Sequence, residues 1–332
     1  MNIPNYFIRL ILFSFLAIFL ASCNEAADSP YADISFSKKA VIDSVGRASA
    51  VAFVIDGKAY VTLGRNENSN DSLKECWQYD PIQDNWSLKA PFPGVARVKA
   101  TAVVVNDTAY VGLGYSRNKG PYSGGNLKDI WMYIPQTDTW SRIEDFPSTA
   151  TDACVSFVYK NNIYVGGGFD KGGFSSEFWK YDRTTHKWNQ LNKLPAAARA
   201  GAVLCADNKH IYFGTGYWTF MENDWWEYSP ETDAWSKRKT MPDNGRVNGL
   251  AFTINNRYFV STGRYFRGNL TGGHVKSDVI EYNAGLNVWY ERGNIPASGR
   301  ENAITFTING KGYIGFGEND TDILNDLWCF EP

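Results

Sequence analysis

One pattern recurs along the chain at nearly constant spacing, and it limits the possible folds more than any other feature of the sequence. In its first copy, Trp77 and Tyr79 are followed by Trp86 seven residues after the tyrosine, and by Arg97 eleven residues later. The tyrosine, or an aromatic residue in its place, recurs at intervals of 47 to 54 residues: Tyr79, Tyr133, Tyr181, Tyr228, Tyr282 and Phe330. Periods of about 20 to 50 residues indicate solenoids or propellers, in which each copy is one structural unit.

Each unit has a fixed part and one variable loop. The fixed part contains an arginine, which Thr151 replaces in the third unit, then an aromatic residue thirteen positions later and a glycine four positions after that. The arginines are Arg47, Arg97, Arg199, Arg246 and Arg300. An acid lies four residues before each tyrosine of the repeat, and only the interval from the glycine to this acid varies, from 8 to 15 residues. All length variation therefore falls in one loop per unit.

The fixed part of a unit has the pattern of four short strands. In the first unit, the β-rich runs 48–55 and 58–64 are joined at Asp56-Gly57, a two-residue signal for a tight hairpin. The sixth unit ends at Pro332 without room for its last strand, but Phe36 lies eleven residues before Arg47, where that strand's aromatic belongs. Residues 33–332 are therefore predicted to form an all-β, six-bladed β-propeller whose ring is closed by its N-terminal strand.

In units two and six, the segment with the acid and the tryptophan matches a known repeat well. These segments are Lys128-Asp129-Ile130-Trp131 and Asn325-Asp326-Leu327-Trp328. With the glycine and the second tryptophan, the pattern resembles the kelch repeat of the galactose oxidase/kelch superfamily over all of residues 33–332. The chain departs from that repeat at its double glycine, which only Gly167-Gly168 retains. The resemblance implies a kelch-type propeller, and lipid-anchored propellers of this appearance are typical of Bacteroidetes-like bacteria.

Residues 1–22 have the features of a targeting segment. Arg9 is followed by an apolar run and then by Leu20-Ala21-Ser22-Cys23, which resembles the lipobox of a bacterial lipoprotein signal peptide. We expect Cys23 to be lipidated, residues 23–32 to act as a tether, and the propeller to be held at the cell envelope by the outer membrane. No other run approaches the ~18 apolar residues that a membrane-spanning helix needs.

Composition and residue spacing argue against several other classes of ligand. The 33 basic and 35 acidic residues are balanced, which gives no electrostatic footprint for nucleic acid. His186, His210 and His274 occupy unrelated positions of the repeat, and the chain has no Cys-x-x-Cys pair. We therefore expect no metal and no cofactor, no membrane contact except through Cys23, and a monomer.

The strand order places the arginines, the acids and the variable loops on one face of the propeller. The two longest loops, 115–128 and 264–277, belong to units two and five, which lie opposite each other in a ring of six. We expect these loops and the residues after each fixed glycine to form a ligand site at the mouth of the channel. Its candidate residues are Tyr115, Arg117, Tyr217, Trp218, Arg264, Tyr265 and Arg267, together with the five repeat arginines.

The arginines and two acids each allow two interpretations. The arginines are candidates to bind a ligand carboxylate, for which the guanidinium group is well suited; alternatively, each pairs with a repeat acid such as Glu75 or Asp129 and joins blades together. Asp152 and Glu301 occupy a position that is small and apolar in the other units. They are either buried partners of neighbouring arginines or a general acid and base.

The sequence favours a non-catalytic binding module that recognises an envelope protein or a glycan, because no nucleophile with a base and no metal set is present. The resemblance to kelch propellers implies an alternative, a sugar-active enzyme such as a sialic acid mutarotase or epimerase. The copper-dependent oxidases of that superfamily are excluded, since the three histidines of this chain cannot converge on one metal.

Overall fold

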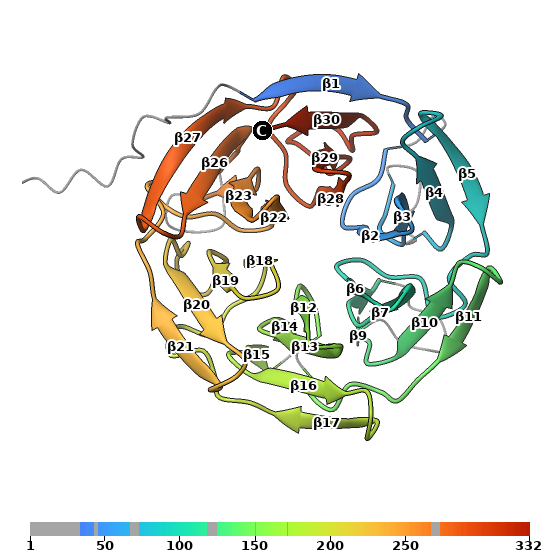
Figure 1. The fold of residues 1–332 in the computed structure, drawn as a ribbon, viewed down its shortest axis with the longest axis horizontal. Helices are drawn as coiled ribbons and strands as arrows, with labels where there is room; N and C mark the ends of the chain where they lie inside the picture. The colour runs from blue at the N-terminus through green and yellow to red at the C-terminus, as the bar shows by residue number, and fades with distance from the viewer. Residues whose placement is uncertain are drawn as a thin grey trace, which may run out of the picture.

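Six four-stranded antiparallel sheets surround a central channel in the computed structural model (Figure 1). The structure describes residues 34–42, 46–66, 73–117, 125–149, 151–170, 172–266 and 273–332. The innermost strands are β2, β6, β12, β18, β22 and β28, and each following strand lies further from the channel. The prediction of an all-β, six-bladed propeller is confirmed.

The first three blades are consecutive meanders. Their strands are β2 (Val51–Ile55), β3 (Lys58–Thr62), β4 (Cys76–Asp80) and β5 (Asn85–Lys89) in blade 1; β6 (Thr101–Val105), β7 (Thr108–Gly112), β10 (Ile130–Ile134) and β11 (Thr139–Arg142) in blade 2; and β12 (Val155–Tyr159), β13 (Asn162–Gly166), β16 (Phe178–Asp182) and β17 (Lys187–Gln190) in blade 3.

The last three blades continue the ring. Their strands are β18 (Val203–Ala206), β19 (Ile211–Gly214), β20 (Trp225–Ser229) and β21 (Ala234–Lys237) in blade 4; β22 (Leu250–Ile254), β23 (Arg257–Ser261), β26 (Asp278–Asn283) and β27 (Val288–Asn294) in blade 5; and β28 (Ile304–Ile308), β29 (Lys311–Gly315), β30 (Leu327–Glu331) and β1 (Ser35–Lys39) in blade 6.

The N-terminal strand closes the ring as the spacing predicts. Strand β1 pairs antiparallel with β30, and Phe36 lies opposite Phe330 with a ring-centroid distance of 5.6 Å. The two ends of the chain thus share one sheet (Figure 1). Separating β1 from β30 would expose both rings of this pair to water. Closing the ring therefore buries apolar surface and stabilises the fold.

The repeat aromatics form the core between neighbouring blades. Tyr79 is fully buried and lies 5.0 Å from the ring of Trp86, and the same pair recurs in blades 2 to 5. The Trp86 indole donates a hydrogen bond of 2.9 Å to the carbonyl of Ala40, which follows the outer strand of the preceding blade. These tryptophans therefore join adjacent blades, and a ligand-stacking role is not needed to explain them.

Two closed rings of backbone hydrogen bonds surround the channel. In the first, the residue two positions after each repeat arginine donates its N–H to the carbonyl of its equivalent in the preceding blade, and Ser49 closes the ring by donating to Asn302. All six residues have a positive φ, between 52° and 62°: Ser49, Lys99, Ala153, Gly201, Asn248 and Asn302. In the second ring, the N–H of each fixed glycine donates to the carbonyl of the arginine position in the next blade, and Gly317 closes it by donating to Arg47.

The repeat arginines are buried in ion pairs with the repeat acids of their own blades. Arg97 donates to both carboxylate oxygens of Asp129, at 2.8 and 2.7 Å, and its side chain is fully buried. Four of the five pairs have this two-pronged form: Arg97 with Asp129, Arg199 with Asp224, Arg246 with Asp278 and Arg300 with Asp326. Arg47 makes a longer contact of 3.4 Å with Glu75. Although burial alone would raise it, Arg97 holds the pKa of Asp129 below its usual value.

These pairs correct the expectation that the arginines ring the channel mouth as ligand-binding groups. The structure shows the alternative, pairing with the repeat acids, but each pair lies within one blade instead of between two. Each arginine also donates to the carbonyl of the residue before the fixed glycine, such as Leu113, which has a φ of 61°. In blade 3 the fixed glycine, Gly168, is preceded by a second glycine, Gly167, and Thr151 replaces the arginine of that blade. The arginine is therefore present in the blades where the residue before the fixed glycine is not glycine. That residue has a positive φ, which glycine would adopt without strain.

Removing one buried guanidinium tests this role. We expect Arg97→Ala to lower the free energy of unfolding by about 3–5 kcal/mol, because Asp129 is left as an uncompensated, largely buried charge. Adding Asp129→Asn should recover part of the loss. Urea unfolding measures both variants, and Arg142→Ala, which removes an exposed pair with Asp145, is the control with an expected cost below about 1 kcal/mol. A cost for Arg97→Ala no larger than that of the control would contradict the structural role.

Candidate functional site

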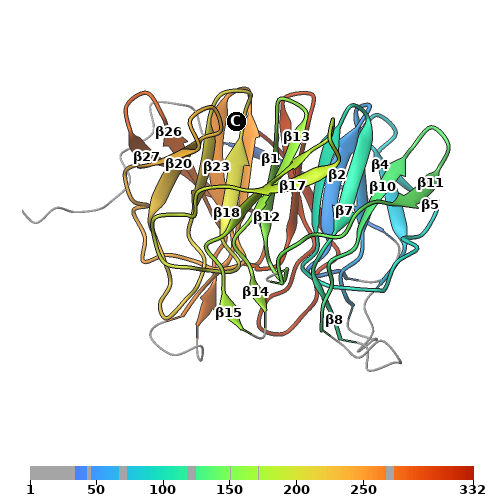
Figure 2. The same ribbon diagram turned by 90° about the horizontal axis from the view of Figure 1, so that it is seen from below.

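Three short hairpins extend one end of the propeller. They are formed by β8 (Tyr115–Ser116) with β9 (Gly125–Asn126), β14 (Phe169–Asp170) with β15 (Gly173–Phe174), and β24 (Arg264–Tyr265) with β25 (His274–Val275). Figure 2 shows β8, β14 and β15 at the same end of the molecule. Each hairpin directly follows a fixed glycine, so the predicted variable loops share one face.

The residues after the six fixed glycines form a ring with two different halves. Each is held by two backbone hydrogen bonds to the residue after the repeat arginine, as between Tyr115 and Val98. Blades 2, 3 and 4 contribute Tyr115, Phe169 and Tyr217, which we name the aromatic arc, and blades 5, 6 and 1 contribute Arg264, Glu318 and Arg65, which we name the polar arc. Contiguous halves of opposite character make the mouth of the channel two-sided.

Side chains of the polar arc are satisfied by one another and by channel asparagines. Arg264 contacts the carboxylate of Glu301 and donates to Asp320 at 2.6 Å, and Arg65 contacts Glu318. Asn248 donates to Glu301 at 2.8 Å. In the same way Asn302 donates to Glu318 at 2.7 Å. This half of the mouth is a rigid hydrogen-bonded network.

The aromatic arc continues into the hairpin of blade 3. The ring of Phe174 lies 5.1 Å from Phe169 and 5.8 Å from Tyr217, the latter in an edge-on arrangement. Phe169 is 37% exposed, and Trp218 and Phe220, which follow Tyr217 in the chain, are 48% and 66% exposed. Apolar rings that stay this open to solvent are suited to stacking on a ligand.

A cavity of about 370 Å³ lies beside the aromatic arc, at the mouth of the channel. We name it the channel-mouth cavity, and its lining residues are Lys99, Asp152, Ala153, Phe169, Phe174, Ala200, Gly201, Tyr217, Val247, Asn248, Phe266 and Glu301. Four of the six residues of the first backbone ring line it, Lys99, Ala153, Gly201 and Asn248, so this part of its wall is fixed by the hydrogen bonds that join the blades. Blades 2 to 6 all contribute side chains or backbone to it.

The two candidate acids meet in this cavity but differ in environment. Glu301 is bound by Arg264 and Asn248, as the partner interpretation predicts. One carboxylate oxygen of Asp152, Oδ1, is buried and has no hydrogen-bond partner among the described residues. Burial raises the pKa of Asp152, and the nearby charges of Lys99 and Arg117 offset only part of this rise. The two acids are thus one paired carboxylate and one carboxyl with a buried oxygen that lacks a partner among the described residues.

The remaining candidate residues are divided between the cavity, its surroundings and the interior. Tyr217 lines the cavity, Arg117 is exposed near Asp152, and Trp218 is exposed but does not line the cavity. Tyr115 and Arg264 are in the mouth ring but do not line the cavity. The ring of Tyr265 packs 5.6 Å from His274, away from the cavity lining. Arg267, the lipidation site Cys23 and the segments 1–22 and 23–32 lie outside the described residues.

Sequence reasoning missed Lys99, Asn248 and Phe174. Lys99 and Asn248 occupy the channel position two residues after the repeat arginine, where the other units carry Ser49, Ala153, Gly201 and Asn302. A charged residue at a position that is otherwise small or polar was the available signal for Lys99. Phe174 depends on the hairpin of blade 3, which the spacing does not indicate.

The described residues contain no metal cluster and no long apolar helix. Within them, no group of three or more His, Cys, Asp or Glu side chains could hold a metal ion. The same residues include no helix of the length and apolarity needed to cross a bilayer.

The environment of Asp152 predicts a pH dependence of stability. A carboxyl whose folded-state pKa is raised destabilises the fold where it is ionised, and the effect disappears as the pH falls through that pKa toward the ordinary value of about 3.9. We expect Asp152→Asn to unfold at higher urea concentration than the parent protein at pH 7, with a smaller difference at pH 4.5. Glu144→Gln, which changes an exposed carboxylate, is the control. Equal or lower stability of Asp152→Asn at pH 7 would show that the carboxylate has a stabilising partner.

Comparisons with known proteins agree with the repeat and the fold. The family model described as the KLHDC2/KLHL20/DRC7 Kelch-repeats domain matches residues 49–263. A solved structure titled "Structure of YjhT" superposes with a TM-score of 0.74 at 18% sequence identity, covering 85% of this chain and 94% of that one. No curated protein matches the sequence. The chain belongs to the kelch repeat family of β-propellers.

Proposed function

We propose that this chain is a non-catalytic binding module that holds part of a glycan in the channel-mouth cavity. The observation that carries the proposal is the division of the cavity lining into aromatic rings, Phe169, Phe174 and Tyr217, and polar side chains, which include Asp152, Asn248 and Glu301. A sugar ring has the same division, with apolar C–H faces that stack on aromatic side chains and hydroxyl edges that need hydrogen-bond partners. The side chains of Lys99, Asp152 and Asn248 line the cavity and supply such partners.

The size and charge of the cavity support a small neutral ligand over an acidic peptide. Ligand pockets commonly span about 300–1,000 Å³, so about 370 Å³ suits one or two sugar rings. The repeat arginines would have to leave their acids before they bound a peptide carboxylate, and breaking such pairs is costly. Among the described residues that line the cavity, Lys99 is the single cation. An envelope protein that presents a glycan-like or aromatic group to the same cavity is the second class of partner.

The cellular setting is also a proposal, and it rests on the sequence. A lipid on Cys23 and the tether 23–32 would hold the propeller at the bacterial envelope, at the outer membrane, as a monomer. This arrangement would keep the propeller within the reach of the tether from the membrane.

Truncating the aromatic arc tests the site. We expect Phe169→Ala and Tyr217→Ala each to weaken glycan binding about 10-fold, since one stacked aromatic contributes roughly 1–1.5 kcal/mol. A glycan array and an envelope pull-down with the chain from residue 24 provide the ligand and the affinities. Ile82→Ala, at a 91% exposed position on the outer turn of blade 1, is the matched control. If all variants bind equally, the cavity is not the site; if only the pull-down retains a ligand, the partner is a protein.

The two acids in different environments favour one alternative, a sugar-active enzyme that exchanges the anomers of a sugar acid such as sialic acid. Asp152 with its raised pKa would act as the general acid or base, and Lys99 would face the sugar carboxylate. NMR exchange spectroscopy on sialic acid measures the rate of anomer exchange. Acceleration that Asp152→Asn abolishes would establish the enzyme, whereas a rate equal to that in buffer would remove this alternative.

A further inference from the structure

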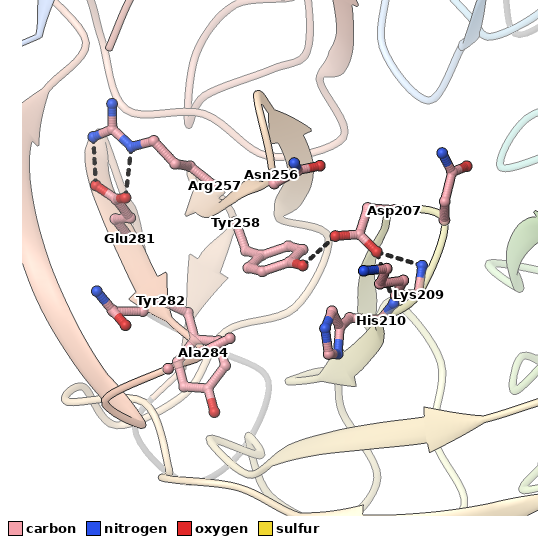
Figure 3. Close-up of a pocket in the computed structure, with 12 residues that line it drawn as sticks. Asp207, Lys209, His210, Asn256, Arg257, Tyr258, Glu281, Tyr282 and Ala284 are labelled. Atoms are coloured by element: carbon pink, nitrogen blue, oxygen red, sulfur yellow. Dashed lines mark hydrogen bonds and ion pairs between the residues drawn. The ribbon is translucent and has the colours of Figure 1, made fainter.

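A second cavity lies at the opposite end of the propeller, at the seam between blades 4 and 5. Its volume is about 480 Å³, and it is formed by the turns that join β18 to β19, β22 to β23 and β26 to β27. We name it the seam pocket, and its side chains include Asp207, Lys209, His210, Tyr258 and Glu281 (Figure 3). Because these turns follow the ends of the inner strands, they lie on the face away from the channel mouth.

The other seams of the repeat serve as internal controls. The last residue of the inner hairpin strand is a buried aliphatic in four blades, and it packs against a small or apolar residue of the next blade, as Ile55 does against Ala109. At the seam of blades 4 and 5 the equivalent residues are Asp207 and Tyr258, and the phenol of Tyr258 hydrogen-bonds to the carboxylate of Asp207. Blade 3 also departs from the aliphatic pattern, with Tyr159, whose hydroxyl donates to Glu231 of blade 4 at 2.6 Å. Asp207 is the one charged residue at this position in the six blades, and packing between blades does not require it.

The carboxylates around the seam pocket already have their donors. Asp207 accepts backbone N–H bonds from Lys209 at 2.6 Å and His210 at 2.7 Å, besides the bond from Tyr258. Glu281 is buried and accepts two bonds of 2.7 Å from Arg257, with Arg292 at 3.4 Å behind it. These acids therefore offer few acceptor positions to a ligand.

The groups that remain open are a lysine and one edge of a histidine. The His210 ring is 43% exposed, and its Nδ1 lies 2.6 Å from Glu227, so the Nε2 edge stays available at the pocket and donates a hydrogen bond when the imidazole is protonated. Lys209 is exposed and has no ion pair among the described residues. Among the residues that line the pocket, the cations Lys209 and Arg257 balance the carboxylates Asp207 and Glu281, before His210 is counted. Arg257 is engaged by Glu281, so the exposed Lys209 is the cation that a ligand meets, and it favours an anion.

We propose that the seam pocket is a second ligand site, which binds the oxyanion of a small molecule, a carboxylate or a phosphate, through Lys209 and His210. The rings of Tyr258 and His210 provide walls for the attached carbon skeleton, since their centroids lie 6.5 Å apart at 79°. The proposal is independent of glycan binding at the channel mouth, because the two cavities share no residue.

The three histidines of the chain give a direct measurement. In the full chain, the ¹H–¹⁵N imidazole signals of His210 are assigned with His210→Gln and followed during titration with inorganic phosphate and, separately, D-glucuronate, with sodium chloride at matched ionic strength as the control. We expect at least one of the two anions to shift the His210 signals, with those of His186 and His274 unchanged. Lys209→Ser should weaken that binding at least fivefold, and Asp152→Asn should leave it unchanged.

Three outcomes would overturn the proposal. The first is the absence of a specific His210 shift with both anions up to about 50 mM, a range that includes weak binding. The second is an equal shift with sodium chloride, which would indicate charge screening. The third is unchanged affinity in Lys209→Ser. A response to glucuronate alone would identify an organic acid, and a response to phosphate alone would identify a phosphate ester as the ligand class.

Discussion

The two closed rings of backbone hydrogen bonds are the constraint on which the rest of this propeller depends. Each ring has one bond per blade, and neither is complete until blade 6 meets blade 1, through Ser49 with Asn302 and Gly317 with Arg47. Because buried N–H and C=O groups must be paired, a blade that tilted or shifted would lose bonds to both neighbours. The rings therefore hold the blades in register and fix the width of the channel.

The arginine–acid pairs extend this constraint from the backbone to the side chains. Arg97 shows the arrangement: its carbonyl belongs to the second backbone ring, its guanidinium group binds Asp129, and one N–H supports the positive-φ residue Leu113. A single side chain thus connects the inner strand, the third strand and the turn between them. The channel mouth rests on a framework whose charges are already neutralised, so the small departures between blades decide what it can bind.

Those departures occur in contiguous groups instead of at scattered positions. Blades 2 to 4 present aromatic rings to the mouth and blades 5, 6 and 1 present ion pairs, while the seam of blades 4 and 5 has a polar pair in place of an apolar one. A repeat protein can vary such positions without altering its fold, because each blade contacts only its neighbours. Both cavities are made in this way, one at each end of the molecule.

The sequence by itself determined the number of blades, their strands and the closure by Phe36, because these follow from local spacing repeated along the chain. It also placed Asp152, Glu301 and Tyr217 on the face where the structure brings them together. It could not decide the role of the arginines. Arg97 and Asp129 are 32 residues apart, and the position of an arginine in the repeat does not show whether its guanidinium group is paired with an acid or free to bind a ligand. The seam pocket likewise depends on Asp207 and Tyr258, which are 51 residues apart and belong to different blades. Only the tertiary structure settles such cases, because burial and pairing arise from side-chain direction between strands, which periodicity does not encode.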